Sequence, residues 1–210
     1  MAELREELLF KQPESSHLGD CPICFLRCHL TKINQVQVCH HVASCVVICG
    51  GCACANQIKD EESMRDPRCP FCREPYITSS AEADRNLLKR IEAGDRVAFR
   101  QKGCQGKEEH NYSVAVDYLT KAANMDDVEA HNQLSQLYYN GEGVERDMKK
   151  AVHHLEEAAI GGHPRARFNL GVVSTRDGKS SRAVKHYIIA ASQGNDDALE
   201  QLKELYKKGD

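Results

Sequence analysis

The stretch "AHNQLSQLYYNGEGVERDMKKAVHHLEEAAIGGHPRARFNLG" runs from Ala130 to Gly171 and decides how most of the chain folds. On either side of Gly141 and Gly143, apolar residues recur at helical spacing. Alanines within the two segments allow helices to approach closely, while the larger leucines fill the space between them. The stretch therefore predicts two packed helices joined by a loop.

The loop itself is the segment "NGEGVERD". Glycine adopts positive φ angles at little steric cost, so we expect such angles at Gly141 and Gly143. Asp147 directly precedes the second helical segment, where an aspartate side chain can accept hydrogen bonds from the first turn. We therefore expect Asp147 to cap that helix.

The same pattern recurs along residues 95–210. Alanines at positions 98, 130, 166 and 198 are spaced by 32, 36 and 32 residues, and Ala115, Ala151 and Ala183 by 36 and 32. Periods in this range indicate a solenoid of helical hairpins. We expect three hairpins and a final half, with helix A around each alanine of the first set and helix B around each of the second.

The stretch from Ala130 to Gly171 resembles a Sel1-like repeat, a relative of the tetratricopeptide repeat. Ser135 stands where that pattern has glycine, which Gly103 and Gly171 supply in the flanking units, and Lys102 takes a leucine position in the first unit. The resemblance covers about residues 95–208 and implies an adaptor surface for protein partners. The matching residues are Ala130, Leu134, Tyr138, Gly141, Gly143, Val144, Asp147, Lys150, Ala151, Ala158 and Ala159.

A cysteine-rich segment, residues 21–78, precedes the repeats. Ten of the eleven cysteines lie between Cys21 and Cys72. The N-terminus lacks the pattern of a signal peptide and we expect no membrane segment, so we expect an intracellular protein, cytoplasmic or nuclear, with reduced thiols. Clustered thiols in that setting indicate metal ligands. Two pairs with CxxC spacing can complete the tetrahedral shell of one zinc ion, and three such pairs are present: Cys21/Cys24, Cys49/Cys52 and Cys69/Cys72.

The segments "CPIC", "ICGGC" and "CPFCREP", in this order, resemble a RING finger, which binds two zinc ions in a cross-brace. The resemblance implies one zinc ion bound by Cys21, Cys24, Cys49 and Cys52. It implies a second zinc ion bound by Cys69, Cys72 and two ligands from the region before Cys49. Here the spacing departs from the family: Cys39, His40, His41 and Cys45 compete, and we favour Cys45 together with either Cys39 or His41. A short central helix is expected over "ACANQIKDEE".

The fold class that follows is a small zinc-stabilised α+β RING-like module joined to an all-α solenoid. Four protein ligands at each zinc leave no position for water, so we expect the metal to be structural. Residues 79–94 read as a linking helix with an apolar stripe of Leu87, Leu88 and Ile91. For residues 1–20 we expect a flexible N-terminus with, at most, a short helix.

The RING resemblance implies a ubiquitin ligase that holds a ubiquitin-charged conjugating enzyme. Ile23 and Pro70 match the apolar contacts to that enzyme, and Arg73 matches the cationic residue that positions the thioester by hydrogen bonding. The alternatives are core packing for Ile23 and a solvated surface charge for Arg73. The repeats would then bind the substrate or an adaptor.

A non-catalytic adaptor with a structural zinc module is the alternative function. A formal net charge of −3 and a pI near 6.4 supply no global basic field, so we expect no nucleic-acid partner.

Overall fold

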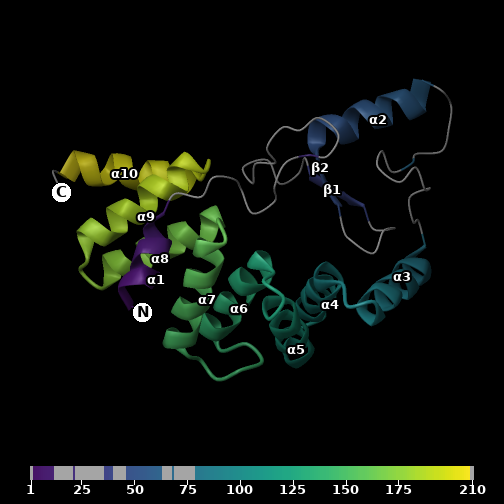
Figure 1. Ribbon diagram of the computed structural model, residues 1–210, viewed down its shortest axis with the longest axis horizontal. Coiled ribbons are helices and arrows are strands. Elements are labelled where there is room, and N and C mark those ends of the chain that lie inside the picture. The colour runs from purple at the N-terminus through teal and green to yellow at the C-terminus, as the bar shows by residue number, and fades with distance from the viewer. Residues whose placement is uncertain are drawn as a thin grey trace.

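The computed structural model describes residues 2–11, 21, 36–39, 46–62, 68 and 79–208. Among these residues the chain is dominated by helices that follow one another in order from α3 to α10 (Figure 1). No helix in this part of the chain is long and apolar enough to cross a membrane. The helices of this series are α3 (Ser80–Glu92), α4 (Arg96–Glu108), α5 (Tyr112–Ala123), α6 (Val128–Asn140), α7 (Met148–Ile160), α8 (Pro164–Arg176), α9 (Ser180–Ser192) and α10 (Asp196–Lys208).

The recurring alanines lie at the contacts between these helices. Helices α4, α6, α8 and α10 carry the first set and are the A helices, whereas α5, α7 and α9 carry the second set and are the B helices. All seven alanines are at most 2% exposed. The contacts pair α4 with α5, α6 with α7 and α8 with α9, and α10 packs on α9. The predicted solenoid of three hairpins and a half is therefore confirmed.

In each of the three complete hairpins, one position of the A helix holds a small residue: Gly103, Ser135 or Gly171. A Cβ atom added at Gly171 would lie 2.5 Å from Cε1 of Tyr187, and one added at Gly103 would lie 2.7 Å from Cγ of Leu119. In the middle unit the position is occupied by Ser135, which is buried and donates its hydroxyl to the carbonyl of Asn132 at 2.7 Å. The small side chains hold each hairpin at a short interhelical distance.

The loop of the middle hairpin has the predicted backbone. Gly141 and Gly143 have φ angles of 77° and 72°. Asp147 accepts hydrogen bonds from the backbone N–H groups of Lys149 and Lys150 at 2.9 and 3.1 Å, so it caps α7 as expected. Both predictions for this loop are confirmed.

Helix α3 occupies the predicted linking segment and packs against α4. Leu87 is buried, but Leu88 is 52% exposed, so the predicted apolar stripe was wrong at Leu88, which lies on the solvent side of the helix. The buried pair Arg90–Asp95, with Nη2 and Oδ2 2.6 Å apart, joins the end of α3 to the N-cap of α4.

The described part of residues 21–78 contains an antiparallel hairpin and a helix. Strand β1 (Val36–Cys39) pairs with β2 (Val46–Cys49), and α2 (Gly50–Glu62) follows at once. Helix α2 includes the segment where the sequence predicts a central helix. The other residues of the predicted RING-like module, apart from Cys21 and Arg68, lie outside the described residues, so the complete module stays a prediction.

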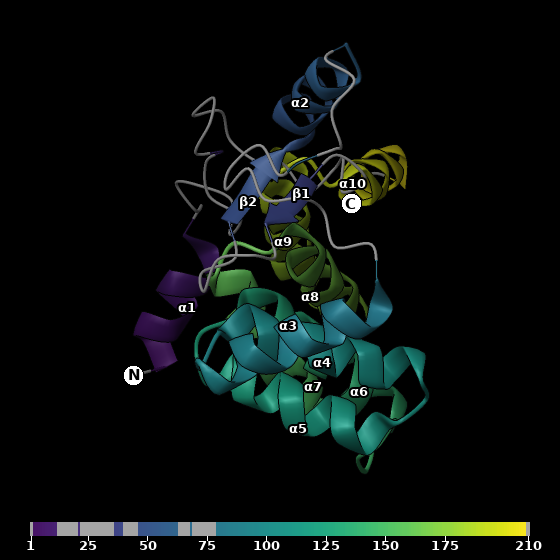
Figure 2. The same cartoon turned by 90° about the vertical axis from the view of Figure 1, so that its right-hand side faces the viewer.

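The N-terminal helix α1 (Ala2–Phe10) packs against α7 and α9. Leu9 is only 1% exposed there. The expectation of a flexible N-terminus did not anticipate this contact, because it joins residues about 150 positions apart. Figure 1 shows α1 and α3 on opposite sides of the view, and in Figure 2, where the right-hand side of Figure 1 faces the viewer, α3 lies in front; it packs on α4, at the other end of the solenoid.

Replacing Gly171 by alanine tests the close approach of α8 and α9. We expect Gly171→Ala to lower the free energy of unfolding by about 1–3 kcal/mol, because the added methyl group overlaps the Tyr187 ring. Urea unfolding followed by circular dichroism measures the change. Ser135→Ala, at the equivalent position of the middle unit, is the control and should cost less. Equal losses in the two variants would contradict a steric limit at Gly171.

Candidate functional site

A polar groove runs along the A-helix side of the solenoid. It has a volume of about 840 Å³ and is formed by α6, α8 and the residues at the start of α10. Amide and charged side chains dominate its lining, and the lining includes no serine, threonine or cysteine that could act as a nucleophile. Its lining residues are Glu129, Asn132, Gln133, Gln136, His163, Pro164, Arg165, Asn169, Gly194, Asn195, Asp196 and Asp197.

Two of the groove amides belong to a row that crosses all four A helices. Gln133 and Asn169 each lie three residues after the first-set alanine of their helix, and Gln101 and Gln201 occupy the same position in α4 and α10. These residues are spaced by 32, 36 and 32 positions, the period of the alanines. A side-chain amide offers both a donor and an acceptor, as a peptide backbone does. The amide row was not among the predicted site residues, although its period is present in the sequence.

A buried hydrogen-bond chain fixes the charge at one side of the groove. The backbone N–H of Ala166 donates to Nδ1 of His163 at 3.1 Å, so Nε2 carries the ring proton and donates to Oε2 of Glu129 at 2.8 Å. Burial raises the pKa of Glu129, but hydrogen bonds from His163 and Gln133 lower it further, to about 2. The groove therefore contains a carboxylate that is ionised near pH 7.

Lys107 orients two of the amides. Its Nζ donates to Oε1 of Gln133 and, at 3.4 Å, to Oε1 of Gln136. Gln133 also donates from Nε2 to Glu129 at 2.8 Å. These contacts hold amide groups in place before a ligand arrives, which lowers the entropy lost on binding.

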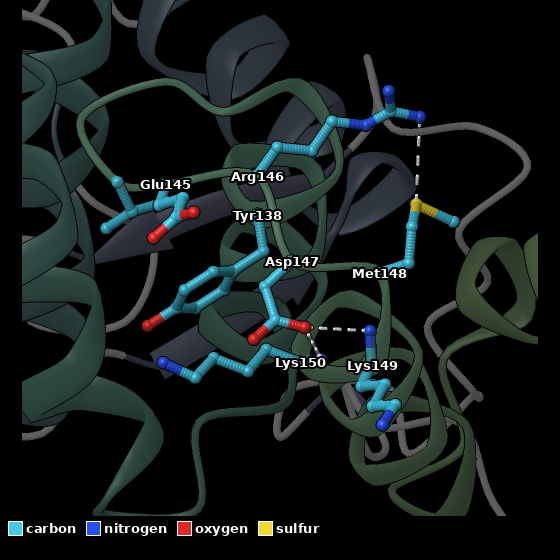
Figure 3. Close-up of a pocket in the computed structure, with 8 residues that line it drawn as sticks. Tyr138, Glu145, Arg146, Asp147, Met148, Lys149 and Lys150 are labelled. Atoms are coloured by element: carbon cyan, nitrogen blue, oxygen red, sulfur yellow. Dashed lines mark hydrogen bonds between the residues drawn. The ribbon is translucent and has the colours of Figure 1, made fainter.

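A second cavity, of about 470 Å³, lies at the loop of the middle hairpin. Figure 3 shows Lys150 running alongside the ring of Tyr138, while Arg146 and Met148 extend to the other side of the loop. The Lys150 Nζ lies 5.3 Å from the ring centroid, and the ring of His154 stacks on Tyr138 at 5.5 Å. Asp147 caps α7, and Lys150 and His154 lie against the ring of Tyr138. These contacts stabilise the loop.

Two histidines share a hydrogen bond below this loop. Nδ1 of His131 and Nδ1 of His154 are 3.0 Å apart, so one must be protonated and the other must accept. Burial and the neighbouring histidines lower the pKa of His154 to about 4, and burial also lowers the pKa of His131. The pair is therefore neutral near pH 7 and acts as packing.

Four of the nine predicted zinc ligands belong to the described residues. Cys21 is buried, Cys52 is half-buried on α2, and Cys39 and Cys49 lie in the paired strands. The described residues alone contain no group of three or more His, Cys, Asp or Glu side chains able to hold a metal ion. The other predicted site residues lie outside the described residues: Ile23, Cys24, His41, Cys45, Cys69, Pro70, Cys72 and Arg73.

The strand register separates two of the predicted ligands. Cys39 pairs with Val46, whereas Cys49 pairs with Val36 at the other end of the hairpin. Three residues along a strand span about 10 Å, which is more than two ligands of one zinc ion can bridge without bending the hairpin. The register is thus compatible with the assignment of Cys39 and Cys49 to different ions.

Three consecutive stretches of the chain are similar to a known repeat. Residues 103–127, 128–163 and 164–195 match the family model of the Sel1 repeat. An uncharacterized protein of Neisseria meningitidis serogroup B is 32% identical over 96 residues, which are 42% of this chain and 20% of that protein. Chitin synthase regulatory factor 4 of Schizosaccharomyces pombe is 31% identical over 86 residues, 40% of this chain and 14% of that protein. The chain thus spans no more than about a fifth of either relative.

Solved structures agree on the fold. A Sel1 repeat protein from Oxalobacter formigenes matches with a TM-score of 0.58 at 23% identity, covering 75% of this chain and 63% of that one. A protective antigen of uropathogenic Escherichia coli with an SLR fold matches with a TM-score of 0.60 at 24% identity, covering 66% and 32%. Identities of this size establish the shared fold alone.

The neutral histidine pair predicts a dependence of stability on pH. An unfolded histidine has a pKa of about 6.5, whereas folding lowers that of His154 to about 4. Between these values the unfolded chain binds more protons, so the stability falls as the pH drops from about 6.5 to 4. His154→Phe keeps the ring on Tyr138 and should lose less stability over this range.

Urea midpoints at pH 7.5 and pH 4.5 measure the effect, with the exposed neighbour replaced in His153→Phe as the control. An identical acid-induced loss in wild type and His154→Phe would contradict the role of His154.

Proposed function

Because residues 103–195 match the family model of the Sel1 repeat, we propose that this protein is an interaction scaffold whose A-helix groove binds an extended segment of a partner protein. The observation that carries the proposal is the amide row Gln101, Gln133, Asn169 and Gln201. An extended peptide presents unpaired N–H and C=O groups along its length, and side-chain amides pair with both. One amide per repeat offers such a contact at regular intervals.

The charges of the groove favour a basic partner segment. Glu129, Asp196 and Asp197 line it together with Arg165, and the Lys107 ammonium is engaged by Gln133 and Gln136. Glu129 stays ionised because of its low pKa. A segment with Lys or Arg between small polar residues complements this surface, and charge complementarity raises specificity and the association rate.

A selection of random peptides against the full chain, followed by titration of the selected peptides, tests the groove. We expect Asn169→Ala to weaken binding at least about tenfold, since one donor and one acceptor to the peptide backbone are lost, each contributing roughly 1 kcal/mol. Asn124→Ala removes an exposed amide at the end of α5, away from the groove, and should leave the affinity unchanged. Selected peptides that bind the wild type, Asn169→Ala and Asn124→Ala with equal affinity would contradict the proposal.

The second candidate function is that of a RING-type ubiquitin ligase. The three CxxC pairs and the hairpin followed by α2 support it, since two closed zinc sites could hold such a module together. In this function Ile23 and Pro70 would contact a ubiquitin-conjugating enzyme, and Arg73 would hold the ubiquitin thioester for attack. The solenoid would bring the substrate, so the two candidates share the groove.

Metal analysis and a self-ubiquitination assay separate the two candidates. We expect two zinc ions per chain, and we expect chelation to unfold residues 21–78 while the helical repeats persist. A ligase would modify itself in the presence of conjugating enzymes and lose this activity in Arg73→Ala and Ile23→Ala. Bound zinc without ubiquitin transfer would contradict the ligase function and leave the scaffold function as the remaining candidate. A chain that is natively folded without metal would contradict the zinc module.

A further inference from the structure

The surface that binds α1 is distinct from the A-helix groove and consists of α7, α9 and the buried side chain of Arg167 on α8; we call it the α1 seat. Leu9 is the apolar anchor, and it belongs to the buried cluster that contains Leu155 and Leu170. The neighbouring Leu4 and Leu8 are 61% and 46% exposed. One leucine of α1 is thus inserted into the solenoid, and the rest of the contact is polar.

Arg167 binds the C-terminal ends of two helices at once. Its Nη1 donates to the carbonyl of Leu9 in the last turn of α1, and its Nη2 donates to the carbonyl of Ala159 in the last turn of α7, at 2.6 Å. Helix C-termini carry a partial negative charge and unpaired carbonyls, so a cation placed between them is stabilised. The arginine is fully buried, which lowers its pKa to about 10 and leaves it charged near pH 7. The seat is therefore built to receive the end of a helix.

Ion pairs at the edge of the seat favour a basic residue and an acidic residue at adjacent positions of the bound helix. Arg5 contacts Glu156 and Glu157 at 3.1 and 2.8 Å. Glu6 contacts Nη1 of Arg182 through both carboxylate oxygens, at 2.6 and 2.8 Å.

An aromatic residue completes the contact. The ring of Phe10 lies 5.3 Å from the guanidinium of Arg182 and from Nζ of Lys185, and 4.7 Å from the ring of His186. The recognised pattern is therefore Arg-Glu, two further residues, then Leu and an aromatic residue at the helix end.

Helix α1 does not satisfy every polar group beneath it. Nε of Arg167 and both ring nitrogens of His186 are buried and have no hydrogen-bond partner in the described part of the chain. A buried polar group without a partner destabilises the folded state relative to a satisfied one. A helix of nine residues also has little stability of its own. The contact is thus specific but incompletely satisfied, as expected for an occupant that can be exchanged.

We propose that the α1 seat is a second protein-binding site, which takes the C-terminal end of a helix of a partner protein with the same Arg-Glu-x-x-Leu-aromatic pattern, and that α1 is its built-in competitor. Because α1 is tethered, it has a high effective concentration at the seat and weakens binding of the partner helix. The exchange has a consequence for the cysteine-rich segment. That segment follows α1 and precedes α3, so replacement of α1 releases one of its two attachments to the solenoid.

Competition with a synthetic α1 peptide tests the proposal on the full chain. A fluorescent peptide of residues 1–11 is titrated into wild type and into Glu6→Arg, whose new charge is repelled by Arg182. We expect the peptide to bind Glu6→Arg at least tenfold more tightly than wild type, because its own α1 no longer fills the seat. Glu6 is on the surface, so the solenoid fold is preserved, as equal thermal midpoints of the repeats would show. Lys203→Glu, exposed on α10, is the control and should behave as wild type.

A charge reversal tests whether the peptide binds at the α1 seat. In the double variant Glu6→Arg, Arg182→Glu, the tethered α1 regains its ion pair, so binding of the wild-type peptide should return to the weak wild-type level. In Arg182→Glu alone, a peptide carrying Glu6→Arg should bind more tightly than the wild-type peptide. Equal affinity of the peptide for wild type and Glu6→Arg, no binding to Glu6→Arg, or no effect of the reversal would each overturn the proposal.

Discussion

The structure depends on close contacts between helices, and these require small side chains at fixed positions. The seven recurring alanines and the glycines Gly103 and Gly171 allow each A helix to approach its B helix, while leucines and Tyr187 fill the remaining space. In a closely packed interior, a change in the volume of one side chain affects the residues packed against it. Because the units repeat, residues at the same position of successive A helices lie on the same side of the solenoid. A residue type that recurs with the period of the alanines therefore forms a row.

Two surfaces with different chemistry result. On the A-helix side, Gln133 and Asn169 of the amide row and the carboxylate of Glu129 line the groove that we propose binds an extended, basic segment. On the B-helix side, α1 packs against α7 and α9, and the side chain of Arg167, which extends from α8, donates to the carbonyl of Leu9 near the end of α1. The helical repeats thus carry the proposed partner groove and the surface that binds α1 on one array, and the cysteine-rich segment lies between α1 and α3 in the chain.

The sequence predicts the solenoid well because its signals are local and repeated. Alanine spacing, the positive φ angles of Gly141 and Gly143 and the cap at Asp147 each follow from the requirements of a single residue type. Leu88 was placed wrongly because a stripe of three apolar residues does not define which side of a short helix is covered. The docking of α1 could not be predicted, since it depends on Arg167, whose residue type alone indicates exposure. The predicted zinc ligands remain predictions, because most lie outside the described residues.

Recognition through the amide row is the central claim, and the side-chain NH₂ resonances of asparagine and glutamine report on it directly. Nuclear magnetic resonance of the full chain, labelled with nitrogen-15 and titrated with a basic extended peptide that it binds, should shift the NH₂ signals of Gln133 and Asn169 together, with Gln101 and Gln201 affected as the peptide lengthens. The signal of Asn124, on α5, should stay in place. Shifts confined to α7 and α9, or an unchanged set of groove amides in the bound state, would contradict the account.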